Sequence, residues 1–296
     1  MHAAPSIALD TAFNTVEHAL QVLVKGDLQD PDLPCVATAA HDLQKAWRLV
    51  NECYISKGYS STPGALWYDR HFLEPRSTCF ITHGARPATM TVIFDSLLGL
   101  PADQVFSPEL DALRREGRRL CEFTALAHAN PHQDLDIQSV YELFRHAWLT
   151  AAHLEKASDI IISVNPRHVP FYRRCLLFER LSPVRSFDKV GGAPAVLMRL
   201  DLLLFETRCR ERIPDSSTTY FYHDDPRRGG LMARIFRQRH APDPWVLAWF
   251  FRHDRDLIGT FTPRQQAWIM QQHPGLADLL REGSPQRDSG RLLAVG

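Results

Sequence analysis

The chain has 296 residues, of which 45% are hydrophobic and 23% charged, and its 34 basic and 34 acidic side chains give a formal net charge of zero. This composition is typical of a globular protein with a sizeable core, and the lack of a basic excess argues against a general nucleic-acid-binding protein. No basic-led apolar segment indicates a signal peptide, and no apolar run approaches the ~20 residues of an integral membrane segment. The six cysteines form no Cys-x-x-Cys pair, so we expect reduced thiols in a cytoplasmic protein.

The first part of the chain predicts an extension followed by alternating helix and strands. Residues 1–34 contain a weak helical pattern that ends at Gly26 and is followed by prolines, which indicates an N-terminal helical extension. A short strand is expected at 35–38 and a helix at 41–54. Two strands joined by a turn are expected at 78–82 and 88–94.

The second part continues this alternation and then changes in composition. In chain order we expect a charged helix at 108–116, a strand at 120–127, an amphipathic helix at 137–156, a strand at 160–164, a short aromatic and basic helix, and strands near 179–187 and 195–204. Beyond residue 205, proline, arginine and tryptophan dominate. The sequence therefore predicts an α/β (α+β) core over 35–205, with a mixed central sheet flanked by helices, and an added helical C-terminal region over 206–296.

Several segments in this order resemble a known family. They are Leu-Val-Asn-Glu-Cys-Tyr-Ile-Ser-Lys-Gly-Tyr at 49–59, the segments 100–103 and 106–114, Gly-Arg-Arg-Leu-Cys-Glu-Phe-Thr at 117–124, and the segment 166–179. The strand, helix and strand around the last of them resemble the final third of the Gcn5-related N-acyltransferase fold. Together the segments resemble the N-acyl amino acid synthase family, which is related to acyl-homoserine-lactone synthases.

The resemblance covers more than half of the chain and implies an activity. The expected reaction is transfer of a long acyl chain from acyl carrier protein to the amine of an amino acid. An acyl-phosphopantetheine thioester would be the co-substrate, with no tightly bound cofactor. An acyl-coenzyme A-dependent N-acyltransferase is one alternative, and a non-catalytic acyl-thioester-binding regulatory module of the same fold is another.

Two departures from related patterns bear on the substrates. The loop 130–136 has no glycine and carries Asp134 and Asp136, which would repel the pyrophosphate of coenzyme A, whereas a carrier protein brings one phosphate. The chain has Glu122-Phe123-Thr124-Ala125 where homoserine-lactone synthases resemble one another in Glu-x-Ser-Arg. The missing arginine argues against S-adenosylmethionine as acceptor and favours a simpler amino acid.

Glu122 is the best candidate for a catalytic base. The ammonium group of an amino acid must lose a proton before it attacks a thioester, and a carboxylate within hydrogen-bond reach can accept that proton. An acid in an otherwise apolar strand is costly unless it is paired or used. The alternative is a structural ion pair of Glu122 with Arg118, Arg119 or another cation at the edge of the core.

The resemblance implies further roles around this strand. A splayed strand at 122–127 would supply backbone N–H groups for the oxyanion, and the residues expected to hold the acyl-pantetheine donor are Phe123, Ala125, Leu126, Ala127 and Asn165. Thr124 would position the substrate, or simply reflect strand propensity. Asn165 could equally cap the following helix. Tyr172 is expected to protonate the leaving thiolate, or to be part of the core.

An acidic carrier protein needs a cationic docking surface. Two clusters qualify, and the alternative for both is a solvated surface: the residues are Arg167, Arg173 and Arg174 beside His168, and Arg114, Arg115, Arg118 and Arg119. Aromatic residues could line an acyl groove or form ordinary core: they are Trp67, Phe72, Phe144, Trp148 and the run 245–251. The histidines at 128, 132, 146 and 153 lack a complete ligand set, so we expect no metal site.

Overall fold

The computed structural model describes residues 33–84, 86–129, 137–205, 207, 227–239, 244–252 and 260–276. Most of the expected N-terminal extension, the loop 130–136 and most of the segment between 206 and 226 lie outside the described residues. The predictions for those segments, including Cys209 and His132, therefore stay predictions.

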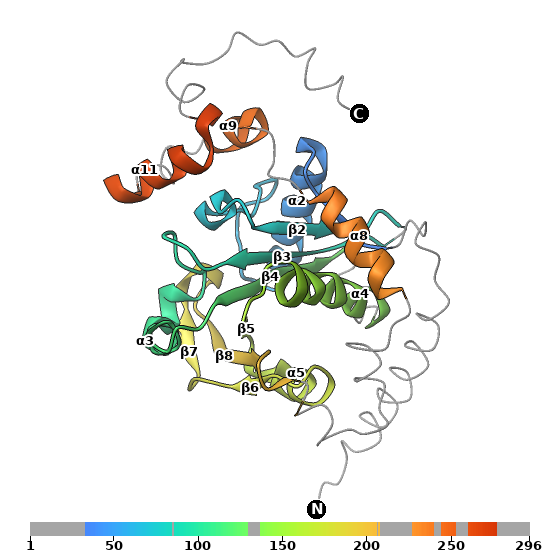
Figure 1. The fold of residues 1–296 in the computed structure, drawn as a ribbon, viewed down its shortest axis with the longest axis vertical. Coiled ribbons are helices and arrows are strands. Elements are labelled where there is room, and N and C mark those ends of the chain that lie inside the picture. Colours follow the sequence, from blue (N-terminus) through green and yellow to red (C-terminus); the bar gives the residue numbers. More distant parts are fainter. Residues whose placement is uncertain are drawn as a thin grey trace, which may run out of the picture.

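The described chain is built on one mixed β-sheet (Figure 1). The strands are β1 (Cys35–Val36), β2 (Thr78–Ile81), β3 (Ala88–Phe94), β4 (Leu120–His128), β5 (Asp159–Val164), β6 (Glu179–Arg180), β7 (Arg185–Phe187) and β8 (Ala193–Asp201). Their order in the sheet is β1-β2-β3-β4-β5-β8-β6, and β7 also pairs with β8. Neighbouring strands are antiparallel except β4 and β5, which are parallel. The expected mixed sheet is confirmed.

Helices cover both faces of this sheet. The α-helices are α2 (Ala40–Ser56), α3 (Asp103–Arg115), α4 (Ile137–Trp148), α5 (Val169–Cys175), α8 (Arg228–Gln238), α9 (Pro244–Arg252) and α11 (Pro263–Gln272). Helices α4, α5 and α8 share one apolar cluster with the sheet, whereas α2, α3, α9 and α11 contribute to clusters on the other face. Figure 1 shows α4 lying along β3 and β4, with α9 and α11 far from α5.

The aromatic run near the C-terminus packs on α2. Phe250 lies edge-on to Trp47 of α2, with 4.5 Å between the ring centroids, and Phe72 contacts the same indole at 4.9 Å. Phe250 and Phe251 are buried, whereas Trp245 and Trp249 of α9 remain 55% and 42% exposed. Phe72 and the inner face of this run are therefore core residues in the structure.

Three predicted elements differ from the observed ones. The helix expected to begin at residue 108 begins at Asp103, and Pro108 lies inside it, just after a kink at Phe106 (φ −120°, ψ 24°). Proline is tolerated there because it occupies the first turn after the kink. The helix expected to run to 156 is α-helical only to Trp148 and then forms a π-helical turn, η2 (Leu149–Leu154). The single strand region expected near 179–187 is divided into β6 and β7.

Candidate functional site

Strands β4 and β5 pair for only a third of the length of β4. The parallel ladder joins Leu120–Glu122 to Asp159–Ile161 and then stops. Beyond it β4 remains paired with β3 as far as His128, and β5 remains paired with β8 as far as Val164. We call this ladder the paired end, and the part of both strands beyond it the open end. Glu122 and Ile161, the last pair of the ladder, form the boundary between the two. Within the described chain, the β5 side of β4 has no strand partner at the open end.

A β-bulge reorients β4 at the open end. Two residues of β4, Ala125 and Leu126, lie between the pairs Thr91↔Thr124 and Thr89↔Ala127, where β3 has only one. Ala125 has φ +55°, a left-handed conformation that is strained for a residue with a Cβ. Such bulges are enriched beside functional sites because they turn the backbone and its N–H groups in a new direction.

The bulge also changes which side chains meet each face. Phe123 and Leu126 contact the cluster that contains α4, whereas Ala125 and Ala127 contact the C-terminal half of α2. Without the extra residue, Ala125 would point to the same face as Phe123 because side chains alternate along a strand. The segment expected to hold the donor thus presents residues to both faces.

Glu122 lies at the last paired position of β4, where the two strands begin to separate. Its side chain is 2% exposed, and Oε2 accepts a hydrogen bond of 2.8 Å from the backbone N–H of Ala102. Among the described residues this is the only hydrogen bond to the carboxylate. Burial raises the pKa of Glu122 to about 8, although the Ala102 N–H and the charge of Lys189 partly oppose the shift. A carboxyl group with this pKa exchanges a proton near neutral pH.

Glu122 does not form the alternative ion pair with Arg118 or Arg119. Arg118 binds Asp159 with N···O distances of 2.6 and 2.8 Å, and it also binds Asp201 at 2.6 Å. Arg119 is exposed and immediately precedes β4. The sequence could not show this, because the partners of Arg118 come from β5 and β8.

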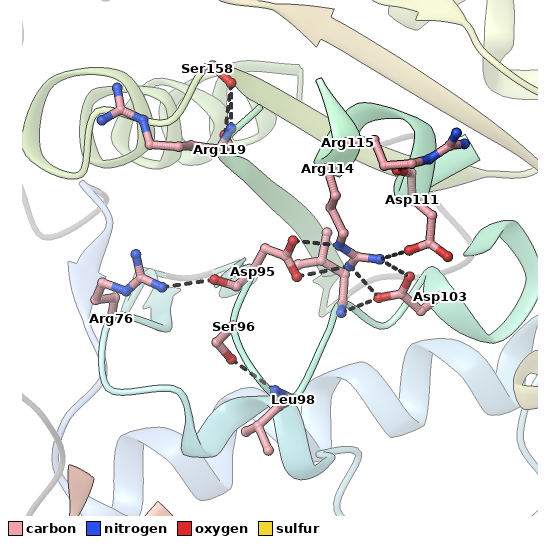
Figure 2. Close-up of polar contacts among 11 residues, drawn as sticks. Arg76, Asp95, Ser96, Leu98, Asp103, Asp111, Arg114, Arg115, Arg119 and Ser158 are labelled. Atoms are coloured by element: carbon pink, nitrogen blue, oxygen red, sulfur yellow. Dashed lines mark hydrogen bonds and ion pairs between the residues drawn. The ribbon is translucent and has the colours of Figure 1, made fainter. Parts of the chain in front are cut away.

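The N–H group that binds Glu122 belongs to a loop held by Arg114 (Figure 2). Arg114 donates to both carboxylate oxygens of Asp95, at 2.7 and 2.9 Å, and to Asp103 at 2.7 Å. Asp103 Oδ2 in turn accepts the backbone N–H of Leu100 at 2.7 Å. The loop between Asp95 and Asp103 is thereby fixed at both ends, which places the Ala102 N–H against Glu122.

Aromatic side chains from the end of α2 and the following loop pack against β4 at Ala125 and Ala127, just beyond Glu122. Tyr54 is in contact with Trp67 (4.6 Å between ring centroids) and with Tyr59 (5.8 Å). Burial raises the pKa of Tyr54, and the charges of Cys53, Tyr59, Glu122 and Tyr172 add to the shift. Sequence reasoning did not single out Tyr54 or Tyr59 as site residues, because both also fit a helix end with ordinary packing.

Tyr172 comes from the other side of the open end. It lies on α5 among Phe144, Phe171 and Phe178, at centroid distances of 5.4–6.0 Å. Burial raises the pKa of Tyr172 to about 12, so the phenol keeps its proton at neutral pH. The side chain therefore has both a core-like environment and a proton that it can donate.

Polar groups at the end of β5 complete the surroundings. Asn165 Oδ1 accepts the backbone N–H of Arg167 at 3.2 Å as the cap of the 3₁₀ turn η3 (Pro166–His168), and Asn165 Nδ2 lies 3.5 Å from Tyr59 Oη. Thr124 is partly buried on β4, opposite Thr91. Ser163 Oγ is buried and makes no hydrogen bond to any described residue. It shares a face with Ile161, the partner of Glu122, and the sequence analysis missed it.

The two arginine clusters differ in their partners. In the first, Arg114 and Arg118 are bound to aspartates, and only Arg115 and Arg119 are exposed. In the second, Arg167, Arg173 and Arg174 are all exposed, and none forms an ion pair with a carboxylate of the described chain. Burial lowers the pKa of His168, and the charges of Arg167 and Lys57 lower it further, so Lys57 extends the second cluster towards the end of α2.

His146 and His153, two of the histidines considered as metal ligands, have different partners in the structure. His146 Nδ1 lies 2.8 Å from the carbonyl oxygen of Glu142, and His153 lies 2.8 Å from Arg228. In the parts of the chain that the structure covers, no three histidine, cysteine, aspartate or glutamate residues gather as metal ligands would. No helix among the same residues is long and apolar enough to cross a bilayer.

Comparisons with known proteins identify relatives of this arrangement. A sequence profile of the family described as N-acyl amino acid synthase FeeM matches residues 45–201, more than half of the chain. The solved structure of FeeM, an N-acyl amino acid synthase from uncultured soil microbes, is 27% identical. That match has a TM-score of 0.51 and covers 59% of this chain and 92% of FeeM. No curated protein matches the chain.

Two further solved structures are less similar. The coenzyme-A-dependent acyl-homoserine lactone synthase BjaI is 11% identical, with a TM-score of 0.41, and the match covers 61% of this chain and 90% of BjaI. A variant of the spermidine N-acetyltransferase SpeG from Vibrio cholerae is 14% identical, with a TM-score of 0.40, covering 59% and 96% of the two chains.

Proposed function

This chain belongs to the N-acyl amino acid synthase FeeM family and is an acyltransferase, and from that premise we propose that it moves a long acyl chain from acyl carrier protein to the amine of an amino acid. The single observation that carries the proposal is the position of Glu122, a buried carboxyl group with a pKa of about 8 where β4 and β5 separate. A separation of this kind offers the pantetheine arm unpaired backbone beside a base.

In the proposed reaction Glu122 takes a proton from the ammonium group of the acceptor, directly or through water. The free amine attacks the thioester carbonyl, so that a C–N bond forms and a tetrahedral oxyanion develops. Backbone N–H groups of β4 beyond Glu122, turned by the bulge at Ala125, would stabilise that oxyanion. Thr124 would position the substrate.

Collapse of the intermediate breaks the C–S bond and releases the pantetheine thiolate. Tyr172, whose phenol is protonated at neutral pH, would supply a proton to that sulfur. The nitrogen loses its second proton to solvent, so an ammonium and a thioester give an amide, a thiol and one released proton. Asn165 and the segment Phe123–Ala127 would hold the pantetheine arm in the open end.

The surface charge supports a carrier-protein donor. Arg167, Arg173 and Arg174 are exposed on η3 and α5, directly after the end of β5, and Lys57 adds a fourth cation. Cations free of local carboxylates are available to an acidic carrier protein and to the phosphate of its arm. In the first cluster only Arg115 and Arg119 are available in this way. We also propose a cytoplasmic location, since the five described cysteines are all free thiols.

A donor-competition assay tests the proposal. The purified protein is incubated with palmitoyl acyl carrier protein or palmitoyl-coenzyme A and a mixture of the twenty amino acids, and products are identified by mass spectrometry. We expect N-palmitoyl amino acids, formed at least ten times faster from the carrier protein. Equal or greater rates with coenzyme A would contradict the proposed donor, and absence of product with both donors would contradict the proposed reaction.

The role of Glu122 has its own test. Glu122→Gln keeps an acceptor for the Ala102 N–H but removes the base, so the rate is expected to fall by roughly 10²–10⁴-fold. The matched control is Glu116→Gln, at an exposed position after α3, which is expected to leave the rate unchanged. A Glu122→Gln protein that folds and retains full activity would show that another group accepts the proton.

A further inference from the structure

A second charged group lies on the side of β4 that Trp67 covers and has no part in the mechanism above. Asp69 accepts hydrogen bonds from the backbone N–H of His71 at 2.9 Å and from Nδ1 of the same residue at 2.8 Å. Its other oxygen, Oδ2, pairs with Nζ of Lys189. The two partners are 120 positions apart: Asp69 precedes the turn η1 (Arg70–Leu73), and Lys189 lies in the turn η4 (Asp188–Val190) between β7 and β8.

These contacts hold a cation in a defined place. Lys189 and His71 keep the pKa of Asp69 well below its usual range, so the carboxylate remains ionised and anchors the ammonium group. The indole of Trp67 covers another side of Lys189, with Nζ 5.8 Å from the ring centroid. The turn itself rests on the loop after α2, because a Cβ built on Gly191 would lie 3.2 Å from the carbonyl oxygen of Gly58.

Lys189 is held in place, but its ammonium group still has N–H donors available for a ligand. Its side chain is 23% exposed, and an ammonium group has three N–H donors. Among the described residues only Asp69 accepts a hydrogen bond from it. Trp67, which covers Lys189, packs in one apolar cluster with Ala125 and Ala127 of β4, so Lys189 lies against the strand just beyond Glu122. In agreement with this position, the charge of Lys189 lowers the pKa of Glu122. A fixed cation with donors to spare beside a proton acceptor is suited to bind a small anion next to a reacting amine.

We infer that Lys189 is the residue that binds the carboxylate of the acceptor, and that it thereby directs the amine of the same molecule to Glu122. This inference rests on the proposed function and adds a residue and a requirement to it. An amino acid carries its ammonium group and its carboxylate on one carbon atom, so a receptor for the carboxylate must lie close to the base. Amines without a carboxylate would then be poor acceptors.

The test compares acceptors with and without the negative charge. The acceptor is the amino acid that reacts fastest with the wild type, measured beside its primary amide, which has the same side chain and amine. We expect the wild type to prefer the acid at least tenfold in kcat/KM. Lys189→Met should raise KM for the acid at least tenfold, change its kcat less than about threefold, and leave kcat/KM for the amide nearly unchanged.

Two further variants separate binding from folding. Lys189→Arg keeps the positive charge and should recover most of the affinity for the acid, whereas Lys45→Met, at an exposed position of α2, should resemble the wild type. Equal losses for acid and amide in Lys189→Met, or an unchanged KM for the acid, would overturn the inference.

If Lys189→Met does not fold, the comparison of the acid with the amide in the wild type still tests whether the enzyme requires a carboxylate on its acceptor. A wild type that acylates the amide as well as the acid contradicts the carboxylate receptor and leaves acyl transfer intact. A wild type that acylates neither contradicts the proposed function, and the inference with it.

Discussion

The paired end of β4 and β5 and the boundary of the open end each contain a buried carboxyl group, and the two groups differ in their partners. At the paired end, Asp159 is fully buried and is bound by Arg118 and Arg199, at 2.6 Å each, and by the hydroxyl of Ser158. Asp201 balances the second positive charge by binding both arginines. At the boundary of the open end, Glu122 has one backbone N–H.

The difference shows how one sheet separates structural from reactive charge. Two aspartates and two arginines at the paired end form a closed network, in which removing any partner leaves a charge unpaired in the interior. Glu122 lacks such a partner, so burial raises its pKa to about 8 and it can change its protonation state in the folded protein. The carboxyl group with the weaker support is therefore the one suited to proton transfer.

Breaking the network at the paired end should have the largest effect on stability. Asp159→Asn leaves two guanidinium groups with Asp201 as their one shared carboxylate and one positive charge in excess, and we expect a loss of about 3–5 kcal/mol in the free energy of unfolding. Chemical denaturation measures it. Asp111→Asn is the control, since that carboxylate is 58% exposed on its pair with Arg114, and its loss should be at most ~1 kcal/mol. Similar losses of unfolding free energy in Asp159→Asn and Asp111→Asn would contradict a special stabilising role for the buried network.

The raised pKa of Glu122 should be visible in the pH dependence of the reaction rate and of the free energy of unfolding. The rate at saturating acceptor is expected to rise with pH and level off above about 8, as Glu122 becomes able to accept a proton. Because the pKa is raised on folding, the folded chain retains a proton that the unfolded chain has lost. Stability therefore falls as pH rises from the ordinary glutamate value towards about 8.

Glu122→Gln removes this pH-dependent cost. Compared with the wild type, we expect the variant to gain stability between pH 5 and pH 9, by up to a few kcal/mol, since each unit of pKa shift corresponds to ~1.4 kcal/mol. Unfolding midpoints of both proteins at pH 5, 7 and 9 provide the measurement. Parallel curves would mean that the environment does not shift the pKa of Glu122.

A smaller effect is expected from the loop of Figure 2, whose Ala102 N–H binds Glu122. Arg114→Gln should reduce stability by about 1–3 kcal/mol, because charged hydrogen bonds to Asp95 and Asp103 are lost. It should also move the midpoint of the pH–rate profile upward, since a looser loop weakens the Ala102 hydrogen bond that lowers the pKa of Glu122. Arg48→Gln, on the exposed side of α2, should change neither quantity. An unshifted midpoint in Arg114→Gln would limit Arg114 to a stabilising role.

The smallest effect is expected at the bulge. Ala125→Gly relieves a left-handed conformation but adds freedom to the unfolded chain, so its stability should stay within about 1 kcal/mol of the wild type. Ala127→Gly, at a buried position that is paired with Thr89 in the ladder, should cost about 1 kcal/mol or more. Thermal unfolding of both variants distinguishes the positions. A greater loss in Ala125→Gly than in Ala127→Gly would argue against strain at the bulge.

Much of the architecture was predictable because it depends on local patterns. The helix α2 and the strands β2 to β5 lie within about two residues of their predicted positions, since periodic burial and turn residues mark them in the sequence. Glu122 was identified because an acid among apolar strand residues is conspicuous. The early start of α3 was missed because Pro108 indicates a helix start, and here it marks the segment after the kink at Phe106.

What surrounds Glu122 was decided by tertiary structure. The pairing of Arg118 with Asp159 depends on the register of β4 and β5, and the pair of Asp69 and Lys189 joins segments 120 residues apart. No periodicity connects such positions, because their contact arises only when the β7–β8 turn packs against the loop after α2. The sequence by itself determined the elements, the family resemblance and the candidate base. Only the folded sheet decided which charges are neutralised at the paired end and which remain available at the open end.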